Sequence, residues 1–148
     1  MSVSYDVFSG AFLDKVEERN FPKDDCLTMK MVDGYMKRAI AQFRHICRYD
    51  LSTTGDDIVR EFHVEIGQAD LDEIADIVSE GMLAQWMKQY VFRSDAYENL
   101  LSTKDFTVHS PSDLVKAVKA SYDGVDRKFT NMMREYSYNH GDLTDLHL

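Results

Sequence analysis

The sequence is poor in residues that interrupt helices. Only two prolines and seven glycines occur among 148 residues, with no low-complexity tract and no repeat at a fixed period. So few breakers leave room for long helices. Cysteine is equally scarce, because Cys26 and Cys47 are too few for a disulfide framework. We expect both cysteines to lie on one helix, too far apart to bridge each other, and to stay reduced.

Long apolar runs and an excess of basic charge are also missing. No apolar run approaches the ~18 residues that a membrane-spanning helix needs, which excludes a transmembrane protein. Residues Met1–Gly10 lack the cationic start and apolar stretch of a secretory signal, so we expect the protein to stay in the cytoplasm. Seventeen lysines and arginines against 26 acidic residues give a net charge of −9. This balance argues against nucleic-acid binding by phosphate neutralisation.

The apolar content is sufficient for a core. Hydrophobic residues make up 44% of the chain and aromatic residues 11%, which is too much for a disordered protein. A length of 148 residues favours one compact domain. We place this domain at residues 1–140, followed by a tail at residues 141–148. The predicted fold is mainly α, with about five helices in a small bundle and one long C-terminal helix.

Apolar side chains at steps of three and four residues locate these helices. We expect helices at Tyr5–Glu18, at Pro22–Arg48, from Asp70 along an apolar stripe that reaches Val91, at Ser94–Leu101, and from Pro111 to just before Gly141. Gly81 falls in the middle of the third helix and costs up to about 1 kcal/mol there against alanine, so we expect it to let another helix approach closely. Trp86 continues the same stripe and is predicted to be buried. The stretch Ile58–Ile66, where apolar and polar residues alternate, fits either a short strand or an extended connector.

Negative charge is concentrated in one stretch. Residues 56–80 hold nine acidic residues and one basic residue, and therefore carry −8 of the net −9. One interpretation is helix capping, because Asp70 and Glu73 resemble a capping box and carboxylates interact favourably with the start of a helix. The other interpretation is an acidic face that binds a basic partner or repels a polyanion.

No pattern in the sequence carries chemistry. The five histidines show none of the spacings of zinc motifs, and no nucleophile elbow, Walker loop or dinucleotide-binding fingerprint occurs. We therefore expect no catalytic residue, no metal site and no cofactor. Each of His45, His63, His109, His140 and His147 is expected at the surface or at the boundary of the core.

One short string needs a separate comment. His140-Gly141-Asp142-Leu143 resembles the His-Gly-Asp segment of aminoglycoside and choline phosphotransferases, in which the aspartate is the catalytic base. Those kinases also need a glycine-rich nucleotide loop upstream and metal-binding residues downstream, on a larger domain. Only six residues follow Asp142, so a helix that stops at Gly141 explains the string better.

Between Phe62 and Tyr138, several short motifs follow one another in a set order. They are Asp72-Glu73-Ile74, the spacing of Met82 and Trp86, Glu98-Asn99-Leu100-Leu101, Lys104-Asp105-Phe106, Ser110-Pro111-Ser112-Asp113-Leu114-Val115 and Tyr136-Ser137-Tyr138. In this order and spacing they resemble the small neck proteins of tailed bacteriophages that infect low-GC Gram-positive hosts. These are head–tail connector or adaptor proteins.

The resemblance implies a structural protein of the virion neck, assembled in the host cytoplasm. Such proteins form a homo-oligomeric ring beneath the portal protein, continue the DNA channel and bind tail or stopper-type neck proteins, without a membrane and without sequence-specific contact to DNA. An excess of carboxylates would let DNA slide without sticking if the acidic stretch faced the channel. The residues of this hypothetical channel lining are Asp56, Asp57, Glu61, Glu65, Asp72 and Asp76.

Contacts with protein partners are expected at the loop around Phe106 and in the segment from Ser137 onward. Leucines outside a regular helix expose apolar groups that another subunit would cover. The candidate partner-binding residues are Phe106, Tyr138, Leu143, Leu146 and Leu148.

Two other functions stay open. The main alternative is a small acidic intracellular regulatory or host-binding module, which would be a monomer or dimer that occupies a basic site on a host enzyme. A hydrolase or transferase that uses His140 and Asp142 is the least favoured alternative.

Overall fold

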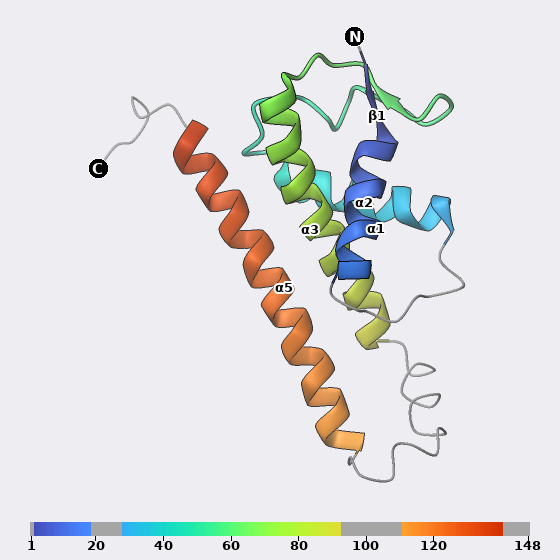
Figure 1. Cartoon of the computed structure of the whole chain (residues 1–148), viewed down its shortest axis with the longest axis vertical. Coiled ribbons are helices and arrows are strands. Elements are labelled where there is room, and N and C mark those ends of the chain that lie inside the picture. The colour runs from blue at the N-terminus through green and yellow to red at the C-terminus, as the bar shows by residue number, and fades with distance from the viewer. Residues whose placement is uncertain (1, 19–27, 93–110, 141–148) are drawn as a thin grey trace.

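The computed structural model describes residues 2–18, 28–92 and 111–140 (Figure 1). Its elements in chain order are β1 (Val3–Ser4), α1 (Tyr5–Glu18), α2 (Met29–Phe43), β2 (Gly55–Asp56), β3 (Glu61–Phe62), α3 (Gln68–Phe92) and α5 (Pro111–His140). The fold is mainly helical, as the sequence predicted, with four helices among the described residues. The helix expected at Ser94–Leu101 lies outside them. None of the helices in the described ranges is long and apolar enough to cross a membrane.

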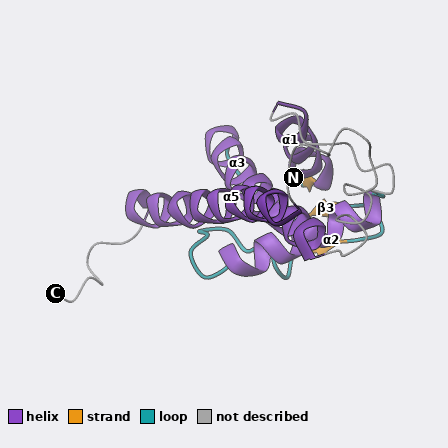
Figure 2. Ribbon diagram, turned by 90° about the horizontal axis from the view of Figure 1, so that it is seen from below, coloured by secondary structure: helices purple, strands orange, loops and turns teal. Residues whose placement is uncertain are grey.

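Helix α3 lies at the centre of the bundle. Helices α1, α2 and α5 all pack against α3, whereas α1 and α2 make far fewer contacts with each other (Figures 1 and 2). Every residue from Ile77 to Ala84 is buried, and eight consecutive residues span about two helical turns. The middle of α3 therefore has no face toward solvent. Trp86 is 4% exposed, which confirms that it belongs to the core.

Close packing on α3 depends on Gly81. A Cβ atom at this position would lie 2.7 Å from the ring of Phe129 on α5 and 2.9 Å from the Cβ of Ala39 on α2. Neighbours on two different helices therefore approach the backbone of α3 at one point. The expectation that this glycine admits another helix is confirmed, and it admits two.

A buried carboxylate links three of the helices. Glu80 of α3 has no exposed side-chain area, and its Oε2 lies 3.0 Å from Nζ of Lys15 on α1 and 3.9 Å from Nζ of Lys128 on α5. The Lys15 ammonium also lies 2.8 Å from the backbone oxygen and 2.7 Å from Oδ1 of Asp76. These contacts fix where α1 and α5 sit along α3.

Helix α5 is an amphipathic rod. Val125, Phe129 and Tyr136 are buried at helical spacing, and Met132 is partly buried between them. Most of the remaining described residues from Lys119 to Asn139 are exposed. One face of α5 therefore completes the core, and the opposite face is left to solvent.

Helix α2 is shorter than the predicted helix Pro22–Arg48, which is a correction. It begins at Met29 because Thr28 is extended and its side chain accepts a hydrogen bond from the N–H of Met31, as an N-cap does. It ends at Phe43, whose oxygen accepts the N–H groups of both Ile46 and Cys47. Cys47 therefore lies beyond the helix rather than on it. Residues 22–27, including Cys26, lie outside the described ranges.

The start of α3 also differs from the sequence prediction. Helix α3 starts at Gln68 instead of Asp70, because the first hydrogen bond runs from the N–H of Leu71 to the oxygen of Gly67 (2.8 Å).

In α1, whose bounds match the prediction, Val7 and Leu13 are 37% and 43% exposed. Phe8, Phe12 and Val16 form the buried stripe there, and the two exposed residues flank it.

The alternating stretch Ile58–Ile66 contributes one strand of a small sheet. Only Glu61–Phe62 is a strand, and it pairs antiparallel with both β1 and β2 in the order β1-β3-β2. Phe62 is 2% exposed and packs on the rings of Tyr5 and Phe8. Strands β1 and β2 were not predicted, because two-residue strands have no measurable periodicity.

Substituting Gly81 with alanine tests the packing on α3. The new methyl group meets Phe129 and Ala39, so we expect the free energy of unfolding to fall by about 1–3 kcal/mol. Gly34→Ala on α2 and Gly124→Ala on α5 are matched controls, because a Cβ at either position meets nothing within 4 Å. Each control should stabilise the protein by up to about 1 kcal/mol. Urea unfolding measures all three, and a Gly81→Ala variant as stable as the controls would contradict the packing.

Candidate functional site

The main candidate site is the hairpin made by β2, β3 and the four residues between them, which lies beside β1 (Figure 1). At its tip Ile58 is 94% exposed and Val59 is 54% exposed. Two neighbouring β-branched apolar residues are thus presented to solvent on a tight turn. We call Ile58 and Val59 the apolar tip.

Arg60 anchors one side of this hairpin. Its Nε and Nη2 donate to the two carboxylate oxygens of Asp33 at 2.9 and 2.8 Å, and its Nη1 donates to Asp6 at 2.9 Å. The hydrogen bonds with Asp33 raise the pKa of Arg60, which keeps the guanidinium charged. The backbone of Arg60 has a φ of 55°, a left-handed conformation that is uncommon for residues other than glycine. The fork of contacts holds the chain in this turn.

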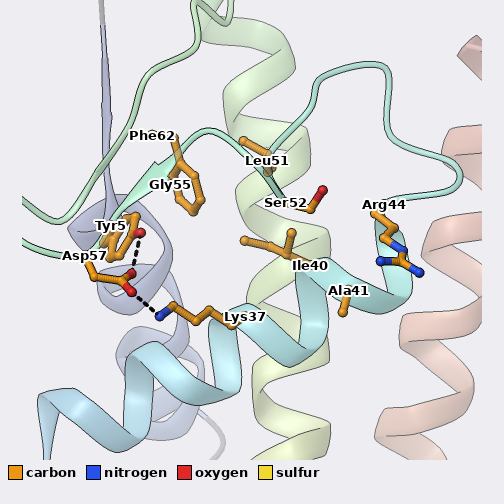
Figure 3. Close-up of a pocket in the computed structure, with 10 residues that line it drawn as sticks. All are labelled: Tyr5, Lys37, Ile40, Ala41, Arg44, Leu51, Ser52, Gly55, Asp57 and Phe62. Carbon is orange, nitrogen blue, oxygen red and sulfur yellow. Dashed lines mark hydrogen bonds and ion pairs between the residues drawn. The ribbon is translucent and has the colours of Figure 1, made fainter.

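Asp56 and Asp57 hold the other side. The carboxylate of Asp56 accepts the N–H of Ile58 at 2.9 Å, and this hydrogen bond lowers the pKa of Asp56. Asp57 accepts hydrogen bonds from Nζ of Lys37 (2.7 Å) and from the hydroxyl of Tyr5 (2.9 Å), as Figure 3 shows. The apolar tip is therefore fixed from both sides by charged side chains.

The same contacts shift two pKa values. The hydrogen bond from Lys37 holds the pKa of Asp57 below its ordinary value. Burial, together with the hydrogen bond to Asp57, raises the pKa of Tyr5 to about 12. At neutral pH Asp57 is therefore ionised and Tyr5 is a neutral donor, as their hydrogen bond requires.

A pocket of about 400 Å³ lies between the base of the hairpin and α2 (Figure 3). It is lined by Tyr5, Lys37, Ile40, Ala41, Arg44, Leu51, Ser52, Gly55, Asp57 and Phe62. Gly55 has little room for a side chain, since a Cβ there would lie 2.7 Å from the hydroxyl of Tyr5. These ten residues include no histidine and no cysteine. The lining combines apolar side chains with the charged groups of Lys37, Arg44 and Asp57.

The proposed acidic face divides among several elements. Asp56, Asp57 and Glu61 lie on the hairpin, Glu65 on the following loop, and Asp72 and Asp76 on α3. Glu61 accepts a hydrogen bond from the hydroxyl of Ser2, Asp72 accepts one from Gln68, and Asp76 pairs with Lys15. Five of the six thus also make structural contacts within the chain. Channel lining stays a hypothesis.

Of the five candidate partner-binding residues, the structure describes one. Tyr138 is 81% exposed near the end of α5. Phe106, Leu143, Leu146 and Leu148 lie outside the described ranges.

A second cluster could hold a metal ion. Asp70 and Glu73 of α3 and His140 of α5 each offer one ligand atom, and the three atoms lie within 4.8 Å of one another. The sequence did not predict this cluster, because His140 on α5 contacts Glu73, which lies 67 residues earlier in the chain. Asp70 and Glu73 were interpreted as a capping box, and His140 was noticed only within the His-Gly-Asp string.

Comparison with known proteins adds no identification. No model of a protein family matches the chain, and neither the curated proteins nor the solved structures gave a match. The resemblance to phage neck proteins therefore stays a prediction from the sequence motifs.

The ion pair between Lys37 and Asp57 predicts a pH-dependent difference in stability between the unmodified chain and the variant Asp57→Asn. Because folding lowers the pKa of Asp57, its ionised side chain stabilises the fold above its ordinary pKa of about 4. That contribution is lost as the pH falls through the lowered pKa. Asp57→Asn should therefore be less stable than the unmodified chain at neutral pH, and the gap should close in acid.

Urea unfolding of both proteins from neutral to strongly acidic pH measures this gap. Glu65→Gln is the control, because Glu65 is exposed in the same acidic stretch and none of the hydrogen bonds or ion pairs found among the described residues involves it. A gap between Asp57→Asn and the unmodified chain that persists in acid would rule out the ion pair as its cause.

Proposed function

We propose that this chain is a structural protein that joins copies of itself and neighbouring proteins, and that it acts as a connector in the neck of a tailed bacteriophage. The observation that carries the first part is the apolar tip, which is exposed on a hairpin held by Arg60, Asp56 and Asp57. The motifs from Phe62 to Tyr138 support the second part.

The energetics of the apolar tip favour a binding role. Burying an isoleucine or valine side chain fully contributes about 1.5–3 kcal/mol. A partner that covers Ile58 and Val59 gains this contribution, and it does not have to order the hairpin first, because the charged contacts already fix it.

Among the described residues, a second candidate binding surface lies on the side of the molecule opposite the hairpin. The C-terminal end of α5, which carries Tyr138, and the hairpin lie at opposite sides of the molecule in both views (Figures 1 and 2). Two different surfaces on opposite sides suit head-to-tail contacts between identical subunits. Such contacts close into a ring when the rotation that relates one subunit to the next permits it. A ring is what the proposed connector requires.

The alternative function predicts a different assembly. A small acidic regulatory module would bind one host protein in a fixed ratio and would be missing from mature particles. The connector would be a ring in the particle and needs no assembly before it meets the portal protein.

Complementation of a virus that lacks this gene tests the proposal. We compare the unmodified chain, the double variant Ile58→Asp, Val59→Asp, and the control Met29→Asp. Met29 is 46% exposed, and an acid is tolerated at the first position of a helix. The unmodified chain and the control should be found in purified particles and, by electron microscopy, in the neck. The double variant should fold normally, bind at least tenfold more weakly by the loss of about 1.4 kcal/mol or more, and be largely missing.

Three results would count against the proposal. Particles without the unmodified chain would refute the connector function, and a defined complex with a host protein would favour the alternative. Incorporation of the double variant at the normal level would show that the apolar tip is not the interface.

A further inference from the structure

We propose that Asp70, Glu73 and His140 form a binding site for one divalent transition-metal ion of the Zn²⁺ type. Asp70 and Glu73 lie in the first two turns of α3, and His140 is the last residue of α5. Their ligand atoms lie within 4.8 Å of one another. These residues lie on α3 and α5 and not on the hairpin, and this inference does not rest on the proposed function.

The spacing suits a metal ion. Residues three apart on a helix share a face, so Asp70 and Glu73 point to the same side of α3, toward the end of α5. Nitrogen and oxygen ligands of tetrahedral zinc lie about 2.0–2.2 Å from the ion, and hence about 3.3–3.6 Å from each other. The three ligand atoms, which lie within 4.8 Å of one another, would close to that separation through side-chain rotation when the ion binds.

Supporting residues already orient two of the three ligands. The hydroxyl of Tyr49 donates to Oδ2 of Asp70 at 2.7 Å, which leaves Oδ1 available. The ring of His140 packs on that of Tyr136, with centroids 4.5 Å apart, and Tyr136 is itself 1% exposed. Hydrogen bonds and packing of this kind around the ligands are typical of metal sites.

The charges around the cluster also favour a cation. His140 Nε2 lies 3.0 Å from Oε2 of Glu73, and among the described residues no lysine or arginine forms an ion pair with Asp70 or Glu73. The ligand atoms of the two carboxylates and the imidazole thus lie within 4.8 Å of one another, and His140 is the one positively chargeable group that pairs with either carboxylate among the described residues. The side chains of His140 and Glu73 are 21% and 37% exposed, so solvent screens them only in part. A divalent ion would balance both carboxylates.

The mixed ligand set decides the class of ion. Imidazole favours zinc and its neighbours in the first transition row, whereas magnesium and calcium prefer sites built of oxygen alone. Three protein ligands leave the fourth position of a tetrahedral ion to water. Bound there, the ion would join the first turns of α3 to the last turn of α5.

To test this site, the full chain is stripped of metal with a chelator and then titrated with zinc in a calorimeter. In a parallel experiment, Co²⁺ gives a visible spectrum that reports tetrahedral coordination. We expect one ion per chain. Glu73→Gln keeps the shape of the side chain and a hydrogen bond to His140, so it should fold, yet its zinc affinity should fall at least tenfold. His140→Ala should have the same effect, and Tyr49→Phe should cost about tenfold through misplacement of Asp70.

His63→Ala is the control, because His63 is exposed on the hairpin side and pairs with Asp56. It should bind zinc like the unmodified chain. Failure of the unmodified chain to bind zinc saturably would overturn the proposal, and so would equal binding by Glu73→Gln and His140→Ala. The contact between His140 and Glu73 would then be a simple hydrogen bond that holds two helices together.

Discussion

The middle of α3 is enclosed on all sides, and the rest of the structure is arranged around that constraint. Gly81 gives Phe129 and Ala39 the space to approach from two directions. One residue earlier, the buried carboxylate of Glu80 meets Lys15 and Lys128 from two other helices. Breaking a buried ion pair by removing one partner costs about 3–5 kcal/mol. Close packing and ion pairing thus set the positions of α1, α2 and α5 along the same stretch of α3.

This arrangement determines which surfaces are left for function. Because α3 receives the apolar faces of its three neighbours, the opposite face of α5 stays exposed, and the tip of the hairpin is exposed as well. The hairpin is not an incidental loop, since Asp33, Asp6 and Lys37 hold it through charged contacts. A fixed apolar tip on one side and a long helix on the other are suited to joining molecules. That is the physical basis of the proposed connector function.

The sequence predicted those features that depend on local periodicity. The bounds of α1, the long final helix, the burial of Trp86 and the role of Gly81 all follow from apolar spacing and from one glycine in a buried stripe. The predicted start of α2 at Pro22 was wrong. Proline is favoured at the first helical position, but Thr28 supplies the cap of this helix. Glu80 was counted in the acidic stretch of residues 56–80, and its burial beside Lys15, 65 residues earlier, has no local signal. The hairpin anchors and the cluster of Asp70, Glu73 and His140 also join distant segments, so periodicity does not reveal them.

Hydrogen–deuterium exchange on the free full-length chain tests the central role of α3 most directly. Amides buried in the most stable part of a fold exchange only when the whole molecule unfolds. We predict that amides between Ile74 and Met87 exchange slowest, and that those of the hairpin and of the outer turns of α5 exchange sooner. Exchange in α3 as fast as in α1 or α5 would contradict it.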